Sequence, residues 1–239
     1  MKLCLAGTNT RKSMFETSLP DLRFVLESYY YMQPWQAEQL KNIEHFMLDS
    51  GAFTFLNTKR NVDIDDYVDS YIKFIKEYDV KHFFELDIDS IVGYEEVKKI
   101  RQKIERRTKK RCIPVWHKSR GIKDFVDTCK KYDYVAIGGI VTKEFEKNEL
   151  FLLNAFCDLA HSYDCKIHGL GFTPVDIKDY RFDSVDSTSW LSGARFGKIY
   201  TFADGRLWST SPEEKKHYLE YDKHNLKQFL LLQDFLCKH

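Results

Sequence analysis

The 239-residue chain is poor in the residues that mark several large classes of protein. It contains 5 prolines and 11 glycines, too few for a collagen-like or low-complexity chain. No excess of one charge is present either. The 37 Lys and Arg against 36 Asp and Glu leave a net charge of +1, which neither requires nor excludes a nucleic-acid partner. The 43% hydrophobic and 31% charged residues are typical of a globular protein, and the length predicts a single domain over residues 1–239.

Long apolar runs and paired cysteines are also missing. No stretch approaches the ~18 uncharged apolar residues that span a bilayer, and the apolar run after Met1 is too short for a secretory signal. None of the 6 cysteines stands in a CxxC or CxC pair, the spacing typical of zinc ligands, and a chain of this length needs no disulfide framework. We therefore expect a cytoplasmic protein with no membrane contact and no metal.

What the sequence does contain is an alternation of short apolar segments with longer amphipathic ones. The apolar segments predict strands over residues 2–8, 23–28, 45–51, 82–88, 112–117, 134–140, 165–172 and 183–189. Helical periodicity covers residues 63–78, 94–108, 121–131, 149–162 and 213–237. Eight such units predict the α/β class, a single (β/α)8 TIM-type barrel with a C-terminal helical extension. The main alternative, an open doubly wound sheet, is disfavoured because no GxGxxG follows the first segment.

Carboxylates inside these apolar strands suggest a site. Strand alternation puts Glu85, Asp87 and Asp89 on the face opposite the intervening apolar residues, so we expect all three to point at the barrel axis. Burying three acids together is costly. A salt-bridged strand end is the structural alternative. Binding or catalysis is favoured, because the carboxyl ends of barrel strands form the active face.

Further polar residues fall at other expected strand ends. Val185 on the helix side turns Asp186 inward and Asp183 outward. Asp49 ends its segment just before a Ser-Gly turn, where an N-cap is the structural alternative. Two glycine pairs and two histidines, each of which alone is more often structural, also lie near strand ends: Gly138, Gly139, Gly169, Gly171, His117 and His168. Together these groups suit chemistry at an anomeric carbon, in which one carboxylate attacks and another handles the leaving group's proton.

The ordered motifs LDSGAF, FELD, CIPVWH, AIGGIVTKE, HGLGFT and VDSTSWLSGARFG resemble the tRNA-guanine transglycosylase superfamily. They are most similar to its short phage members, the 7-deazaguanine DNA transglycosylases, as is LESYYYM near residue 30. The resemblance covers about residues 45–200. It implies an enzyme that exchanges guanine in a nucleic acid for a 7-deazaguanine through a covalent aspartyl-glycosyl intermediate. No cofactor is implied beyond the free 7-deazapurine, such as a 7-cyano or 7-aminomethyl form. If a phage encodes the chain, the location is the host cytoplasm.

The resemblance also implies roles for individual residues. Asp49 corresponds to the acid/base aspartate, and Asp87, with Asp89, to the reader of the guanine edge. His117 stands where the tRNA enzymes carry a base-binding Gln. The rest of the implied base pocket is Ser50, Gly51, Gly138, Gly139, His168 and Gly169, with Phe53, Trp116 or Phe172 stacking on the base. For the nucleophile, alignment of FDSVDS with the FDCV of the tRNA enzymes selects Asp183. Strand alternation and the VDSTSW pattern select Asp186, which we favour.

The sequence departs from the tRNA enzymes by lacking their CxCxxC zinc motif and by being shorter, so DNA is favoured over tRNA as the partner. A tRNA transglycosylase or N-glycosidase remains an alternative. A non-catalytic nucleic-acid-binding subunit is another, although retention of all three key aspartates argues against it. Basic residues after strand ends are the expected nucleic-acid contacts: Lys118, Arg120, Lys143, Arg195 and Lys198. The basic run 98–111, with nine Lys or Arg, predicts a solvated outer helix leading to the barrel's opposite end.

Overall fold

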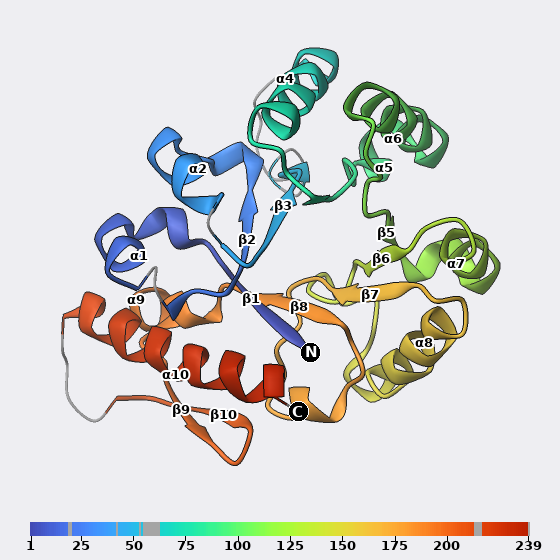
Figure 1. The fold of residues 1–239 in the computed structure, drawn as a ribbon. Coiled ribbons are helices and arrows are strands. Elements are labelled where there is room, and N and C mark those ends of the chain that lie inside the picture. Colours follow the sequence, from blue (N-terminus) through green and yellow to red (C-terminus); the bar gives the residue numbers. More distant parts are fainter. Residues whose placement is uncertain (19–20, 42, 53, 55–62, 213–216, 239) are drawn as a thin grey trace.

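The computed structural model describes residues 1–18, 21–41, 43–52, 54, 63–212 and 217–238. Parallel strands form its centre and helices surround them (Figure 1). The strands are β1 Lys2–Ala6, β2 Phe24–Ser28, β3 His45–Asp49, β4 His82–Phe83, β5 Val115–Trp116, β6 Tyr134–Ile137, β7 Lys166–Gly169 and β8 Ser184–Ser187. Each lies within one of the eight segments that the sequence predicts as strands, so the α/β fold of the TIM type is confirmed.

The eight strands form one curled sheet in the order β4-β3-β2-β1-β8-β7-β6-β5. Its two edge strands meet through a single parallel bridge between Phe84 and Ile113. At this bridge the Ile113 amide donates to the Phe83 carbonyl at 2.8 Å, and the Glu85 amide donates to the Ile113 carbonyl at 3.1 Å. The closure brings the carboxyl ends of all eight strands together at one mouth.

The helices confirm the periodicity argument where the amphipathic segments are long. Their bounds are α1 Lys12–Ser18, α2 Pro34–Leu40, α4 Ile64–Glu77, α5 Asp89–Val92, α6 Tyr94–Thr108, α7 Gly121–Cys129, α8 Leu152–His161, α9 Ser192–Phe196 and α10 Tyr218–Lys238. The α4 helix starts where the Asp63 side chain accepts a hydrogen bond from the Asp66 amide, an N-cap. None of these described helices has the length and apolarity needed to cross a bilayer.

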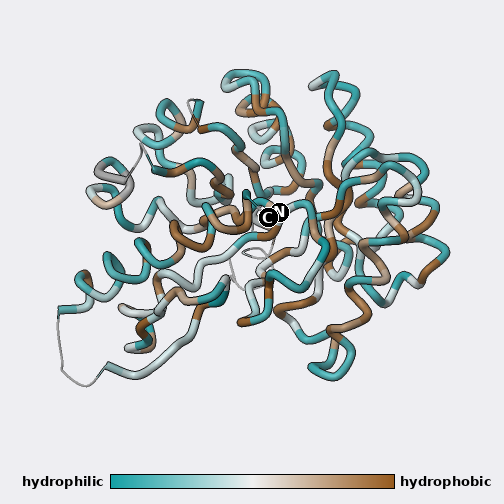
Figure 2. Tube along the Cα trace, turned by 60° about the horizontal axis from the view of Figure 1, so that its bottom comes forward, coloured by the Kyte–Doolittle hydropathy of each residue, from teal (hydrophilic) through white to brown (hydrophobic). Residues whose placement is uncertain are grey.

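Two additions follow the barrel. A hairpin that the sequence analysis missed joins β9 Ile199–Ala203 to β10 Arg206–Thr210 through Asp204 and Gly205, both at positive φ. The α10 helix confirms the expected C-terminal helix over its described part, and residues 213–216 of that expectation lie outside the described residues. It packs against β1, where the Gln233 amide donates to the Leu3 carbonyl at 2.8 Å. The two ends of the chain therefore lie side by side (Figures 1 and 2).

Strand alternation sorts the core into two layers. Residues facing the helices include Leu5, Val25, Leu48, Val135, Ile167 and Val185. Residues packed inside the barrel include Cys4, Phe24, Met47, Phe84, Val115 and Ala136. The hydrophobic stretches accordingly run through the strands and the helix sides that cover them (Figure 2). An inward-facing polar residue at the carboxyl end of a strand therefore lies at the mouth.

One expectation about direction is wrong. Glu85 does not face the axis; its carboxylate lies 3.3 Å from Arg101 of α6 and accepts a hydrogen bond from the Val115 amide at 2.7 Å. The reason is that β4 is short, ending at Phe83, and Phe84 takes the inward place. Beyond it the chain is irregular, so strand alternation no longer applies.

Residues of the basic run 98–111 form ion pairs with the acidic face of α4. Lys103 pairs with Asp65 at 2.9 Å and with Asp69 at 3.0 Å, and Arg107 also reaches Asp69. These pairs tie α6 to α4, which agrees with the expected outer helix.

Candidate active site

Asp186 lies on β8 and points into the barrel mouth, as strand alternation predicts. Its Oδ1 accepts a hydrogen bond from the Gly171 amide at 2.7 Å and lies 3.2 Å from Nε2 of His168. Nε2 of His168 faces this carboxylate, and Nδ1 of the same ring lies within hydrogen-bond distance of the Ser184 hydroxyl below. Ser184 in turn contacts the Tyr134 hydroxyl. A buried polar chain thus holds Asp186 from inside the barrel.

Asp183 points the other way. Its Oδ2 accepts a hydrogen bond from the Ile167 amide at 2.8 Å and lies 2.9 Å from Nε2 of His161 on α8. Of the two candidate nucleophiles, Asp186 alone is presented to the mouth.

Asp49 ends β3, and the pKa of its carboxyl group is raised. Its Oδ2 accepts a hydrogen bond from the Gly51 amide at 3.1 Å, which favours the ionised form. Burial nevertheless raises the pKa of Asp49 to about 6, and the charges of Asp186 and Asp87 add to that rise. Asp49 can therefore carry a proton at nearly neutral pH, while Asp186 receives two stabilising donors. Two carboxyl groups in such different surroundings suit the separate roles of acid and nucleophile.

Asp87 and Asp89 are held in an ionic network. Nε2 of His117 lies 2.7 Å from Oδ2 of Asp87, and Nδ1 lies 2.6 Å from Oε1 of Glu144. Both ring nitrogens can donate only in the protonated imidazole. Burial alone would lower the pKa of His117, but the hydrogen bonds and charges of Asp87 and then Glu144 raise it to about 9. His117 is thus an imidazolium between two carboxylates.

Arg120 completes this network. Its guanidinium donates to Asp89 at 2.6 and 3.2 Å, lies 3.5 Å from Asp87, and stacks 4.0 Å from the centre of the Tyr94 ring. Burial would raise the pKa of Asp89, but the Arg120 bond lowers it. The Arg120 side chain is only 7% exposed, so its guanidinium is turned toward Asp87 and Asp89 and away from solvent. Its expected contact with a nucleic acid stays a prediction.

The predicted glycines make room for neighbouring side chains. A Cβ at Gly138 would lie 2.9 Å from the His117 ring, and one at Gly139, where φ is +76°, would collide with the Glu144 carboxyl group. Gly51 has φ +80° and lies against Tyr30 and Tyr67. Ser50 is buried beside it, and Gly169 on β7 packs against Phe182 and Phe172. The space in front of Gly138 and Gly139 is therefore filled by His117 and Glu144.

The other expected ligand contacts divide clearly. Three of the expected nucleic-acid contacts are exposed on segments that follow strands: Lys143, Arg195 and Lys198. Another, Lys118, pairs with Glu149 at 2.7 Å. Trp116 and Phe172 are buried against the helices, packed on Phe125 and on Tyr180 respectively, so neither is presented for stacking in the mouth. Phe53 lies outside the described residues.

Fold and site together define a TIM-type α/β barrel with a cluster of acids at its carboxyl end. No protein-family model matches the chain, and no curated protein matches it in sequence. Function is therefore inferred from the residues of the mouth.

Two of those residues escaped the sequence analysis. Glu144, six residues after Gly138, joins the mouth through His117, and Tyr67 of α4 donates to the Ser50 carbonyl at 2.6 Å. The signal for Glu144 was an acid in the loop after the AIGGI strand. Tyr67 had no signal, because helical periodicity marked it only as an apolar-face residue.

Proposed function

We propose that this protein exchanges guanine in DNA for a free 7-deazaguanine. The observation that carries the proposal is the pair of mouth carboxyl groups. Asp186 is fixed by two donors, and Asp49 has a pKa raised to about 6 by burial and by neighbouring acids. The motif resemblance supports the same reaction class, and the absence of CxCxxC from the sequence favours DNA over tRNA.

In the first half-reaction, a guanine is flipped out of the strand into the mouth. Asp186 attacks C1′, so that a C1′–O bond forms while the C1′–N9 bond breaks. The bonding electrons leave with guanine, which takes a proton from Asp49. The product is a covalent glycosyl ester on Asp186, with Asp49 now ionised.

The second half-reaction retraces the first with the other base. Asp49 removes the N9 proton of the 7-deazaguanine, whose N9 attacks C1′ and releases Asp186. Asp87, with Asp89, accepts hydrogen bonds from N1–H and the amino group of the base. The Gly139 amide donates to O6, because the Gly138 amide is already bonded to the Trp116 carbonyl at 2.9 Å; this requires the Glu144 side chain to move away from Gly139.

The test is incubation of the protein with a 7-deazaguanine and DNA that carries labelled guanine, and separately with labelled tRNA. Release of label from DNA, with uptake of the deazapurine seen by mass spectrometry of nucleosides, is the expected result. Single-stranded DNA should react faster than a stable duplex, because less unpairing is needed. Release from tRNA but not DNA would refute the choice of substrate. Release without uptake would identify an N-glycosidase, and no release from either would identify a binding subunit.

A further inference from the structure

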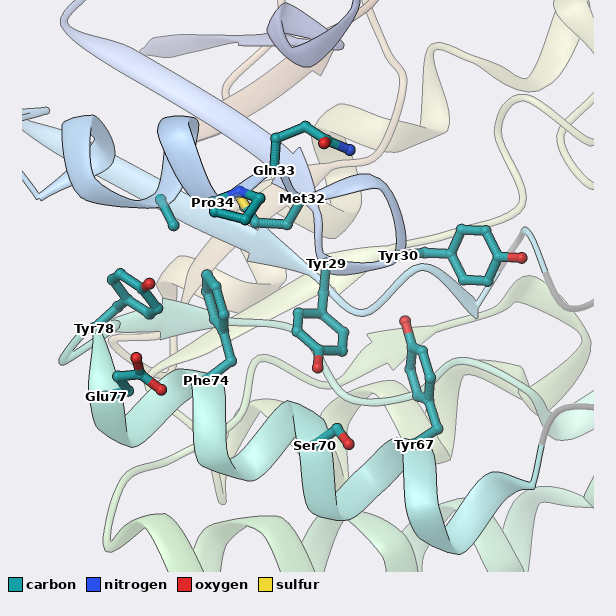
Figure 3. Close-up of a pocket in the computed structure, with 11 residues that line it drawn as sticks. Tyr29, Tyr30, Met32, Gln33, Pro34, Tyr67, Ser70, Phe74, Glu77 and Tyr78 are labelled. Carbon is teal, nitrogen blue, oxygen red and sulfur yellow. The ribbon is translucent and has the colours of Figure 1, made fainter.

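A second concave surface lies outside the barrel, between α4 and the segment from Tyr29 to Ala37. It is a groove of about 500 Å³, a volume within the roughly 300–1,000 Å³ of small-molecule sites. Five of its 11 lining residues are aromatic: Tyr29, Tyr30, Tyr67, Phe74 and Tyr78 (Figure 3). The ring centres of Tyr29 and Phe74 are 5.3 Å apart and those of Phe74 and Tyr78 are 4.5 Å apart, so the wall is nearly continuous.

The groove adjoins the Asp49 turn. Tyr67 lines the groove and donates to the carbonyl of Ser50, the residue after Asp49, at 2.6 Å. A Cβ at Gly51 would lie 2.6 Å from Cβ of Tyr30 and 3.0 Å from the Tyr67 hydroxyl. Burial and then the Asp49 charge raise the pKa of Tyr67. One end of the groove therefore shares its wall with the turn that positions the proposed acid.

The charge of the groove restricts what can enter it. Among the described residues that line it there is no Lys or Arg, and Glu77 is the charged one. A nearby cation, Lys41, lies 5.1 Å from the centre of the Tyr78 ring and is paired with Glu38 at 2.8 Å. A phosphate in the groove would be repelled by the Glu77 carboxylate. A planar ring would find aromatic faces, and its N–H groups would find acceptors in Glu77 and in Ser70, toward which the Tyr29 hydroxyl points (Figure 3). The lining thus fits a nucleobase and not a sugar-phosphate backbone.

We propose that this groove binds an unstacked base of the same DNA strand, close to the exchanged guanine. This inference rests on the proposed function, because flipping one guanine leaves its neighbours without a stacking partner. Aromatic side chains bind such bases through their π-faces with little sequence preference. The groove then anchors the strand beside the mouth, while the exposed Lys143 and Arg195 remain for phosphates.

The experiment measures binding of single-stranded oligonucleotides with one guanine and a single abasic site at position −2, −1, +1 or +2. Fluorescence anisotropy gives Kd for the wild-type chain and for Ser70→Trp, which fills the groove from an exposed position of α4. The matched control is Gln102→Trp, at an exposed neutral position of α6. A second variant, Phe74→Leu, removes a ring without filling space, and thermal melting verifies that each variant folds.

One abasic position should weaken wild-type binding by roughly tenfold, the effect of losing one stacked base. Ser70→Trp should bind the intact strand about tenfold more weakly and lose its sensitivity to that abasic site, whereas Gln102→Trp should behave as wild type. The proposal is refuted if no abasic position matters, or if Ser70→Trp stays equally sensitive. Guanine release is measured on the same samples. If the binding pattern appears without guanine release, the exchange reaction is refuted and base binding in the groove is supported. If guanine is released without the binding pattern, base binding in the groove alone is refuted.

Discussion

The two ends of the barrel bury titratable groups among the same eight strands but tune them in opposite directions. At the carboxyl end, Asp49 and His117 both have raised pKa values, about 6 and about 9. At the amino end, burial and then the charge of Lys2 lower the pKa of His45 to about 3, and the same two causes lower that of His82. The His45 and His82 rings lie 4.6 Å apart.

Neighbouring charge explains the contrast. Burial acts at both ends and always disfavours the charged form. At the mouth two carboxylates outweigh burial and keep His117 protonated, whereas at the amino end the nearby cation adds to burial and keeps His45 neutral. The mouth therefore keeps Asp49 and His117 protonated to a higher pH than usual, and the opposite end keeps His45 and His82 neutral to a lower one.

The largest effect should separate the acid inside the mouth from the acid outside it. We expect Asp186→Ala to lower guanine exchange by on the order of a thousandfold or more, because it removes the proposed nucleophile. Asp183→Ala should retain most activity, because that carboxylate bonds to His161 and the Ile167 amide outside the mouth. Release of labelled guanine from DNA measures both. If Asp183→Ala were inactive and Asp186→Ala active, Asp183 would be the nucleophile and the assignment to Asp186 would be wrong.

A smaller effect is expected at the other mouth carboxyl group. Asp49→Asn should reduce kcat by about a hundredfold or more, the usual contribution of general acid–base catalysis. In the wild-type chain, kcat/KM for guanine release should fall as the pH rises through about 6, because Asp49 must be protonated to donate. The variant should lose this limb of the pH profile. A wild-type profile that is flat between pH 5 and 7 would contradict the assignment.

At the amino end we expect instability in acid. His45 has a folded-state pKa of about 3 against about 6.5 unfolded, so the unfolded state binds more protons between these values. Stability should decrease as the pH falls below 6.5, by roughly 2 kcal/mol at pH 5. Urea unfolding of the wild type and of His45→Phe at both pH values measures the difference, which the variant should reduce. An imidazole of His45 that titrates near 6.5 by NMR would disprove it.

The mouth should show the reverse dependence at alkaline pH, with an effect of similar or smaller size. The folded-state pKa of His117 is raised to about 9, so its stabilisation is complete below 6.5 and is lost as the pH rises through 9. Relative to His117→Gln, the wild type should lose about 2 kcal/mol between pH 7 and 9. Unfolding curves at several pH values provide the measurement. Parallel pH dependences in the two proteins would mean that the Asp87 and Glu144 bonds do not stabilise the imidazolium.

The barrel could be predicted because its signals are local. Apolar segments and helical periodicity identified all eight strands, and the helix expected over 94–108 is α6 with those bounds. The hairpin over 199–210 was missed although Asp204-Gly205 between apolar residues is a strong hairpin signal. Glu85 was misdirected because the expected alternation put Phe84 on the helix side with Leu86, whereas Phe84 faces the barrel interior and the alternation breaks after Glu85.

The site was predictable only in part, for a related reason. Alternation within β8 is regular, so it correctly turned Asp186 inward and Asp183 outward. The partners of Asp87 come from loops after β5 and β6, and no local pattern records that His117 and Glu144 meet there. Contacts between distant loops need the closed barrel to be known first.

The packing of α10 on β1 also sets an order for folding during synthesis. The Gln233 amide reaches carbonyls of Leu3 and Phe24, some 230 and 209 residues earlier in the chain. Until the ribosome has released α10, the outer faces of β1 and β2 lack this cover, and their apolar residues stay open to chaperones or to other chains. Among the eight barrel strands β1 is therefore made first, yet its outer face is covered only after α10 has been made.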